Sequence, residues 1–148
     1  MTLEALERTS LSSTELRGYH DHLRGEESEN RVAQVLAELP TVVAIRRTQL
    51  NSPEDAEGVD MFVHLKQTGV LPPDFFVKVQ VKSSKRTRRD FRESISRRHG
   101  VPGNQRNQWL TANGFVVLIG QSNESEIASE FYGQLDRIIE LQKKHSEP

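Results

Sequence analysis

Two stretches near the middle of the chain alternate between apolar and polar residues, as half-buried β-strands do. In residues 59–65 the apolar positions are 59, 61, 63 and 65, which leaves Asp60 on the opposite face. In residues 75–82 valine occupies positions 77, 79 and 81, which leaves Gln80 and Lys82 on the opposite face. The segment between them contains glycine and proline, so we predict a hairpin in which Asp60 lies across from residues 80–82 on one polar surface.

A helix is predicted over residues 26–39, because the apolar residues from Val32 to Leu39 form one stripe at helical spacing and Pro40 follows. Extending this stripe toward the N-terminus reaches Glu29. A carboxylate at the end of a buried stripe needs a partner, which makes Glu29 a candidate site residue.

The remaining patterns predict two strands and four helices. The strands cover residues 41–48 and 115–119. The helices cover residues 12–24, a short stretch capped by Asp90, residues 105–112 and residues 124–143. We expect Ser12 to cap the first of these helices and Gly25 to end it.

The order of the elements predicts one α/β domain over residues 1–148. Its core, about residues 26–120, runs helix, three strands, helix, strand, and we expect a mixed sheet flanked by helices. Residues 12–24 are predicted as an N-terminal helical extension and residues 124–143 as a C-terminal amphipathic helix.

Composition restricts the classes of function. The chain of 148 residues fits one domain of ordinary size, and its net charge of -1 indicates no partner by itself. The absence of cysteine excludes a disulfide scaffold, a thiolate nucleophile and a Cys-ligated zinc site. With no signal peptide and no apolar run of membrane-span length, we expect a cytoplasmic protein with no membrane partner.

Charge becomes informative in one segment, because eight of the residues from Lys82 to Arg98 are basic. Such a run suits binding of a phosphate backbone without reading of sequence, and it begins directly after Lys82. The alternative is a solvated basic helix and loop. The candidate nucleic-acid-binding residues are Ser83, Ser84, Lys85, Arg86, Arg88, Arg89, Arg92, Arg97 and Arg98.

The polar surface of the hairpin has the composition of a site for phosphodiester hydrolysis. Mg²⁺ or Mn²⁺ binds carboxylate, carbonyl and water oxygens. Asp60 supplies an anionic ligand, Gln80 a neutral oxygen and Val81 its main-chain carbonyl oxygen. Glu29 completes the acidic side if its helix packs against the sheet. Lys82 is placed to orient or deprotonate an attacking water and to offset charge on the phosphorane.

Three matches together resemble the PD-(D/E)xK nuclease superfamily: Glu29 in a helix, Gly58-Val59-Asp60, and Gln80-Val81-Lys82-Ser83-Ser84. The resemblance is to the branches with glutamine in place of the second acid, such as Mrr-type restriction endonucleases and related bacterial domains of unknown function. It covers about residues 26–120 and implies a restriction-endonuclease-like core.

The resemblance also implies a function. It makes Glu29 the helix acid, Asp60 the metal-binding aspartate, Gln80 the variable ligand and Lys82 the catalytic lysine. The implied activity is Mg²⁺- or Mn²⁺-dependent endonucleolytic hydrolysis of nucleic acid, with DNA favoured over RNA. Gln80 departs from the commoner acidic ligand, and a neutral ligand should weaken metal affinity.

Two other functions remain open: a non-catalytic nucleic-acid-binding module and a protein-interaction module on the same fold. A homodimer, a fusion to other domains or a complex with them also remains possible. At the level of single residues, Asp60 and Lys82 alternatively form a cross-strand ion pair, and Glu29 alternatively faces solvent near a helix N-terminus.

Overall fold

The computed structural model describes residues 13–49, 52–53, 58–67, 71–72 and 75–146, with side chains described between residues 25 and 144. The Ser12 cap lies outside the described residues. In chain order the elements are α2 (Ser13–Ala37), β1 (Val42–Arg47), β2 (Met61–Leu65), β3 (Phe76–Lys82), α4 (Lys85–His99), the 3-10 helix η1 (Gly103–Gln105), α5 (Arg106–Ala112), β4 (Phe115–Ile119) and α6 (Glu124–Ser146).

Four strands form one mixed sheet in the order β1-β2-β3-β4. The β1–β2 and β2–β3 pairs are antiparallel, and the β3–β4 pair is parallel. The predicted hairpin is confirmed, since Met61 lies opposite Val79 in the antiparallel β2–β3 pair. One residue before β2, the backbone N–H of Asp60 donates to the Val79 carbonyl at 2.9 Å. Asp60 therefore lies across from the C-terminal end of β3, as the alternation predicts.

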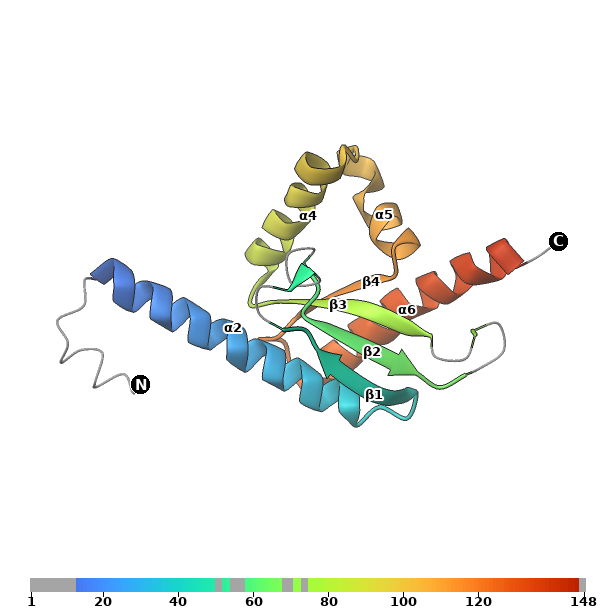
Figure 1. Cartoon of the computed structure of the whole chain (residues 1–148), viewed down its shortest axis with the longest axis horizontal. Coiled ribbons are helices and arrows are strands. Elements are labelled where there is room, and N and C mark those ends of the chain that lie inside the picture. Colours follow the sequence, from blue (N-terminus) through green and yellow to red (C-terminus); the bar gives the residue numbers. More distant parts are fainter. Residues whose placement is uncertain (1–12, 50–51, 54–57, 68–70, 73–74, 147–148) are drawn as a thin grey trace.

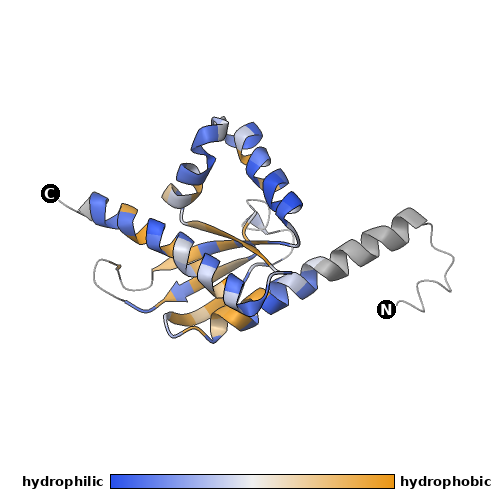
Figure 2. Cartoon of the chain, turned by 180° about the vertical axis from the view of Figure 1, so that it is seen from behind, coloured by the Kyte–Doolittle hydropathy of each residue, from blue (hydrophilic) through white to orange (hydrophobic). Residues whose placement is uncertain are grey.

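Helices cover both faces of the sheet, which confirms the mixed α/β class. Helices α2 and α6 pack on one face, and α4 with α5 stands on the other, near β3 and β4 (Figures 1 and 2). The N-terminal half of α2 extends beyond the sheet (Figure 1). None of the helices in the described part of the chain is both long and apolar enough to cross a membrane.

The core consists of two apolar clusters, one on each face of the sheet. The larger cluster joins the apolar stripes of α2 and α6 to the residues of β2, β3 and β4 that face these helices. Its fully buried members include Leu36, Val79 and Phe131. The smaller cluster lies beneath α4 and α5 and contains Phe91 and Phe115. The smaller cluster also holds Val59 and Phe62.

Val59 corrects the predicted alternation. We placed it on the same apolar face as Met61, but it packs in the smaller cluster, with Phe62. Regular strand pairing begins only at Met61, so the side chain of Val59, two residues earlier, need not follow the period of the strand. Gly58, with φ of 87°, turns the chain immediately before it.

Two helices differ from their predicted limits. Residues 13–37 form a single helix that continues through Gly25, because a glycine inside a helix costs only about 1 kcal/mol, and α2 is held by its packed C-terminal half. Helix α4 begins earlier than predicted, because the Ser84 hydroxyl accepts from the Thr87 N–H and the Thr87 hydroxyl accepts from the Ser84 N–H. This reciprocal cap replaces the cap predicted at Asp90.

A side chain pairs with the middle of the outer edge of β4. The Gln134 amide on α6 accepts from the Val117 N–H at 2.8 Å and donates to the Val117 carbonyl at 2.9 Å. One glutamine thus makes with Val117 both hydrogen bonds that a neighbouring strand would make there.

Candidate functional site

Asp60, Gln80 and Lys82 line one pocket of about 510 Å³ between the end of β3 and α4. Their shared position follows from the β2–β3 register and from the alternation of β3, which places Gln80 and Lys82 on one face. The full lining is Gly58, Asp60, Gln80, Lys82, Thr87, Asp90, Phe91, Ser94 and Arg98. The three strand residues predicted for the site are therefore brought together.

Several effects together raise the pKa of Asp60 from 3.8 to about 7, and burial is the largest of them. The Val81 backbone N–H, which donates to Asp60 Oδ2 at 2.7 Å, lowers the pKa, while the charge of Glu29 and a hydrogen bond with it contribute to the rise. The ammonium of Lys82 has a smaller, lowering effect. The surroundings of Asp60 therefore favour its protonated form more than water does.

Glu29 reaches the site from α2 and is shared between two partners. Its carboxylate accepts from the Arg47 guanidinium at 2.7 Å and also interacts with the carboxyl group of Asp60. The predicted gathering of Glu29 with Asp60 is therefore present, and the Glu29 side chain, which is 31% exposed, also remains in contact with solvent. Arg47 was absent from the sequence prediction, since nothing in a strand pattern indicates which outward arginine meets a helix.

The position of Glu29 depends on a very close approach of α2 to the end of β4. Ser28, the residue before Glu29, is buried against Gly120. A methyl group at position 120 would lie 2.6 Å from Ser28 Cα and closer still to Ser28 Cβ. Gly120 is also tied to β3, because its N–H donates to the Lys82 carbonyl at 2.8 Å. One backbone contact thus links the helix of Glu29 to the strand of Lys82.

Gln80 has a side-chain oxygen that accepts no hydrogen bond from the described part of the chain. The residue is only 6% exposed, and its Oε1 is buried without a hydrogen-bond partner among the described residues. Its amide nitrogen makes a long 3.4 Å hydrogen bond to the Val81 carbonyl. An unpaired buried acceptor costs about 1–3 kcal/mol, so a bound donor, water or cation at this oxygen would be stabilising.

Gly58 leaves room for that oxygen. A Cβ at position 58 would stand 3.3 Å from Gln80 Oε1 and 3.0 Å from the Phe91 ring, and the φ of 87° already disfavours any side chain there. The glycine that precedes Asp60 therefore shapes the pocket beside the unpaired amide oxygen. Its place in the Gly58-Val59-Asp60 match was visible in the sequence, but its contact with Phe91 was not.

The Val81 carbonyl points toward the same side of β3 as its N–H. In an extended strand both groups of one residue point the same way, and the Val81 N–H donates to Asp60. The carbonyl of the next residue, Lys82, points to the other side, where it accepts from Gly120. Since β2 begins only at Met61, the Val81 oxygen is directed past the end of β2 toward Asp60.

Lys82 places its ammonium in the pocket beside an aromatic ring. The Nζ atom lies 5.1 Å from the centroid of the Phe91 ring on α4. Among the ion pairs of the described residues, none joins Lys82 to Asp60. The cross-strand ion pair considered as an alternative is therefore not formed, and the ammonium is available to a ligand. Phe91 is thus a neighbour of the ammonium that no sequence pattern had marked as a site residue.

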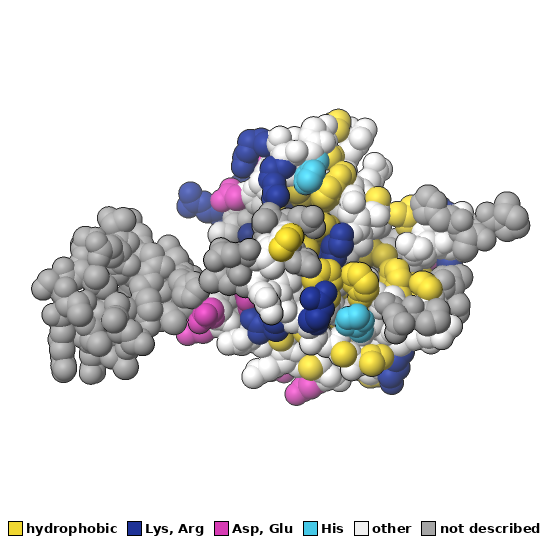
Figure 3. Space-filling view, in the orientation of Figure 1, with side chains coloured by type: hydrophobic (Ala, Val, Ile, Leu, Met, Phe, Trp, Pro, Cys, Tyr) yellow, Lys and Arg dark blue, Asp and Glu magenta, His cyan; other side chains and the backbone are white. Residues whose placement is uncertain are grey.

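The predicted basic segment does not form one surface. Successive residues of a helix are rotated by about 100°, so α4 divides its cations among several faces. Arg98 lines the pocket of Asp60, whereas Arg88 and Arg92 line a separate pocket beside α6. Lys85, Arg86, Arg89 and Arg97 are exposed. Figure 3 shows Lys and Arg side chains over α4 and also over the sheet below it.

Ser83 and Ser84 are less exposed than cations such as Lys85 and Arg86. Both are partly buried, and Ser84 serves as the N-cap of α4. Their proposed contact with nucleic acid stays a prediction, as does that of the arginines and of Lys85.

The donors at the pocket suit a hard cation. Asp60 and Gln80 line the pocket and supply a carboxylate and an amide oxygen. Glu29, which interacts with Asp60, and the Val81 carbonyl are not part of the lining and would add two further oxygens from beside it. No group of three or more His, Cys, Asp or Glu among the described residues is arranged to hold a metal ion, so a cation here would depend on the two neutral oxygens and on water.

Comparisons with protein-family models, with curated proteins and with solved structures yield no match to the chain.

Proposed function

We propose that the protein is a metal-dependent phosphodiesterase that cleaves nucleic acid within the strand, built on a restriction-endonuclease-like core. The observation that carries the proposal is the meeting in one pocket of Asp60, the Lys82 ammonium and the Gln80 oxygen, which has no partner among the described residues, while Glu29 interacts with Asp60 from α2. A site of two carboxylates, one neutral oxygen and one lysine has the donors for a hard divalent ion and the cation for phosphoryl transfer.

Mg²⁺ or Mn²⁺ fits this donor set. Asp60, Glu29, Gln80 and the Val81 carbonyl would hold it, with waters completing its coordination. When bound, the ion supplies Lewis acidity, which lowers the pKa of a bound water and polarises a phosphoryl oxygen.

The chain's own residues then serve the reaction in distinct ways. Asp60 would hold the ion as a carboxylate, although burial and Glu29 favour its protonated form when no ion is bound. Lys82 orients the attacking water and offsets the negative charge that grows on the non-bridging phosphate oxygens. The water oxygen forms a bond to phosphorus, the bond from phosphorus to the leaving sugar oxygen breaks, and that oxygen takes up a proton. Arg98 lines the pocket at the side where the phosphate backbone would pass.

The substrate would approach over exposed cations on two elements. The exposed cations of α4 include Lys85, Arg86, Arg89 and Arg97. On β1 the exposed Arg46 lies over Phe62, with its Cζ atom 4.3 Å from the centroid of the ring. These contacts recognise phosphate charge and not base sequence. DNA is favoured over RNA only by analogy with the family that the sequence resembles.

Nicking of supercoiled plasmid in Mg²⁺ or Mn²⁺ tests the proposal. The wild-type protein should convert supercoiled plasmid to open circles, and Asp60→Asn and Lys82→Met should each lower the rate by about 10²–10⁴-fold, because each removes one group that acts in the transition state. Lys66→Met is a matched control, since Lys66 is exposed and follows β2 outside the pocket.

Cleavage that persists in both Asp60→Asn and Lys82→Met would show that the nuclease activity comes from another site or from a contaminant. Chelation by EDTA should abolish the wild-type activity, and restoring either ion in excess should recover it.

One observation favours a second candidate, a nucleic-acid-binding module without catalysis. The lining of the pocket holds two carboxylates, Asp60 and Asp90, and two cations, Lys82 and Arg98, and Gln80 adds no charge. The pocket therefore carries little net negative charge with which to attract a divalent ion. Salt-sensitive DNA binding without nicking in any divalent metal would favour this candidate.

A further inference from the structure

A second polar pocket, of about 240 Å³, lies on the other flank of α4, between this helix and α6. Phe91 and Ile95 form the buried stripe of α4; residues at 87, 94 and 98 lie to one side of it, and Arg88 with Arg92 lies to the other. The second pocket is thus separated from the Asp60 pocket by the packed face of the helix.

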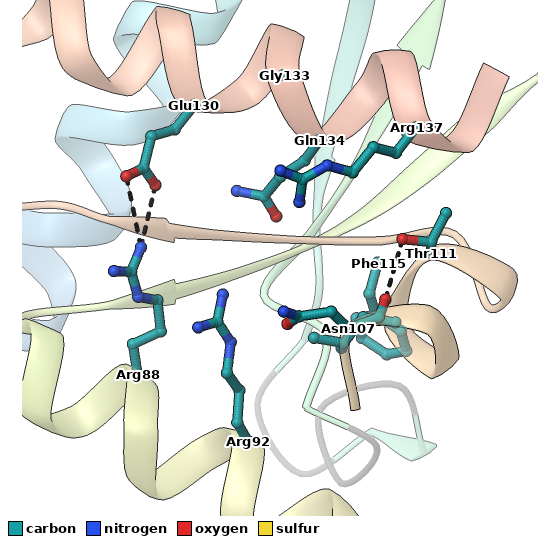
Figure 4. Close-up of a pocket in the computed structure, with 10 residues that line it drawn as sticks. Arg88, Arg92, Asn107, Thr111, Phe115, Glu130, Gly133, Gln134 and Arg137 are labelled. Carbon is teal, nitrogen blue, oxygen red and sulfur yellow. Dashed lines mark hydrogen bonds and ion pairs between the residues drawn. The ribbon is translucent and has the colours of Figure 1, made fainter. Parts of the chain in front are cut away.

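Three guanidinium groups converge on this pocket from two helices. Arg88 and Arg92 point from α4 toward α6, and Arg137 points back from α6 (Figure 4). Glu130 is the one carboxylate in the lining and pairs with Arg88 at 3.1 Å. Three arginines and one glutamate give the lining a formal charge of +3 − 1 = +2.

Arg92 carries a buried hydrogen-bond donor that lacks an acceptor in the described part of the chain. Its Nε atom is buried and has no hydrogen-bond partner among the described residues. Burial and then the charges of Arg88 and Arg137 lower the pKa of Arg92, against the raising effect of Glu130. A buried guanidinium donor without an acceptor is unfavourable, and a ligand with acceptor oxygens would relieve it.

Neutral donors complete the lining. The side-chain amide of Asn107 on α5 is directed at the same space as Arg92 (Figure 4). The Gln134 amide, by contrast, is already engaged by Val117 through both of its polar atoms. The donors available to a ligand therefore come from α4, α5 and α6, on different sides of the cavity.

We propose that this pocket binds a phosphate group, either as inorganic phosphate or as the monoester at the end of a nucleic acid. A phosphate monoester carries a charge of about -1.5 to -2 near neutral pH, which matches the excess charge of the lining. Its tetrahedral oxygens accept from guanidinium groups that arrive from different directions, and such charge-assisted hydrogen bonds are among the stronger ones. The volume lies below the range of about 300–1,000 Å³ typical of pockets for drug-sized ligands, so it suits a single small anion.

This site does not rest on the proposed nuclease function. Its residues lie outside the Asp60 pocket, and the Asp60→Asn variant should bind phosphate like the wild-type protein. Loss of nicking with retained phosphate binding would thus separate the two proposals.

Calorimetric titration with inorganic phosphate, together with thermal unfolding in phosphate and in chloride at equal ionic strength, tests the site. Phosphate should raise the midpoint of wild-type unfolding by about 5 °C or more at a concentration of 100 times Kd. Arg92→Gln and Arg137→Gln should each weaken phosphate binding at least about tenfold. Arg137 is exposed, so its variant keeps the test informative if Arg92→Gln folds poorly.

Arg31→Gln is the matched control, because Arg31 is exposed, lies on α2 and belongs neither to this lining nor to the candidate nucleic-acid-binding residues. It should bind phosphate like the wild-type protein. Equal midpoints in phosphate and chloride for the wild-type protein, or an equal loss of binding in Arg31→Gln, would overturn the proposal.

Two oligonucleotides that differ only in a 5′-phosphate or a 5′-hydroxyl distinguish the sources of the phosphate. Tighter binding of the phosphorylated strand by the wild-type protein, lost in Arg92→Gln, identifies a nucleic-acid end as the ligand. Equal binding of both strands, with the shift by inorganic phosphate retained, identifies a free phosphate.

Discussion

At the scale of single residues, Asp60 shows how the pocket is balanced. Its carboxyl group accepts a short hydrogen bond from Val81, yet burial and Glu29 oppose its charge more strongly. The protein without a cation therefore binds a proton where the proposed active form needs an anion. Proton and metal ion compete for the same carboxylate, which gives stability and metal affinity a common pH dependence.

The stability of the metal-free protein should fall as pH rises from about 4 to about 7. The pKa of Asp60 is 3.8 in the unfolded reference and about 7 in the folded protein, so the folded state binds more protons between these values. The stabilising contribution is complete below pH 4 and is lost as pH rises through 7, an effect on the order of 2–4 kcal/mol.

The Asp60→Asn variant should lack this slope and be more stable than the wild-type protein at pH 8.5. Its amide oxygen still accepts from Val81, while no charge is buried beside Glu29. Urea unfolding in EDTA at several pH values measures the difference. Asp136→Asn, at an exposed position of α6, should keep the wild-type slope, and an unchanged slope in Asp60→Asn would contradict the assignment.

Gln80→Glu should convert the neutral donor into a third carboxylate beside Glu29 and Asp60. Without metal at pH 8, the buried added charge should destabilise the protein by about 1–3 kcal/mol. With metal, the variant should bind Mg²⁺ at least about tenfold more tightly, because a charged ligand replaces a neutral one. Metal titration followed by calorimetry measures this, with exposed Gln108→Glu as the control.

At the scale of elements, the strands were easier to predict than the helix starts. The hairpin and β4 follow from short-range alternation and apolar runs, and the structure has them where they were predicted. The start of α4 was missed because two patterns compete within a few residues: Ser84 with Thr87, and Asp90 with Glu93. The first forms the cap, and the second lies inside the helix. Local sequence does not decide between adjacent caps when both flank good helix formers.

Helix α2 brings Glu29 to the sheet, and its docking should be sensitive to position 120. Gly120→Ala places a methyl group inside van der Waals distance of Ser28, so α2 must move away from β4. We expect a loss of about 2–4 kcal/mol in stability and a weaker effect of Glu29 on the pKa of Asp60. Urea unfolding and the pH slope described for Asp60 measure the two effects.

Gly25→Ala is the control on the same helix. No atom lies near the added methyl group, and alanine favours a helix, so this variant should be stabilised by about 0.5–1 kcal/mol. A Gly120→Ala protein as stable as the wild type would show that α2 adjusts without cost.

At the scale of the whole molecule, the site combines parts of very different predictability. Asp60, Gln80 and Lys82 lie on paired strands, so alternation and one turn sufficed to place them together. Predicting the place of Glu29 would have required knowing how α2 docks on the sheet. Predicting the contacts of Arg47 and Phe91, and the pocket lined by Arg92, would have required the orientations of the helices relative to the sheet and to one another. Those contacts depend on three-dimensional packing, which no local period encodes.

Mg²⁺ should stabilise the whole fold at pH 8 and much less at pH 5. A ligand that binds only the folded state adds RT ln(1 + [Mg²⁺]/Kd) to its stability, about 2.7 kcal/mol at 100 times Kd. At pH 5 the proton on Asp60 competes with the cation. Thermal unfolding with and without Mg²⁺ measures the effect, and Asp60→Asn should show no shift at either pH.

Glycine at position 120 is demanded by the distance between two backbones and not by a turn, since its φ is not among the positive values that favour glycine. The position of Glu29 beside Asp60 is therefore fixed by a junction too narrow for a single methyl group. If the proposed function holds, position 120 is constrained by spacing alone, since a glycine brings no side chain to the site.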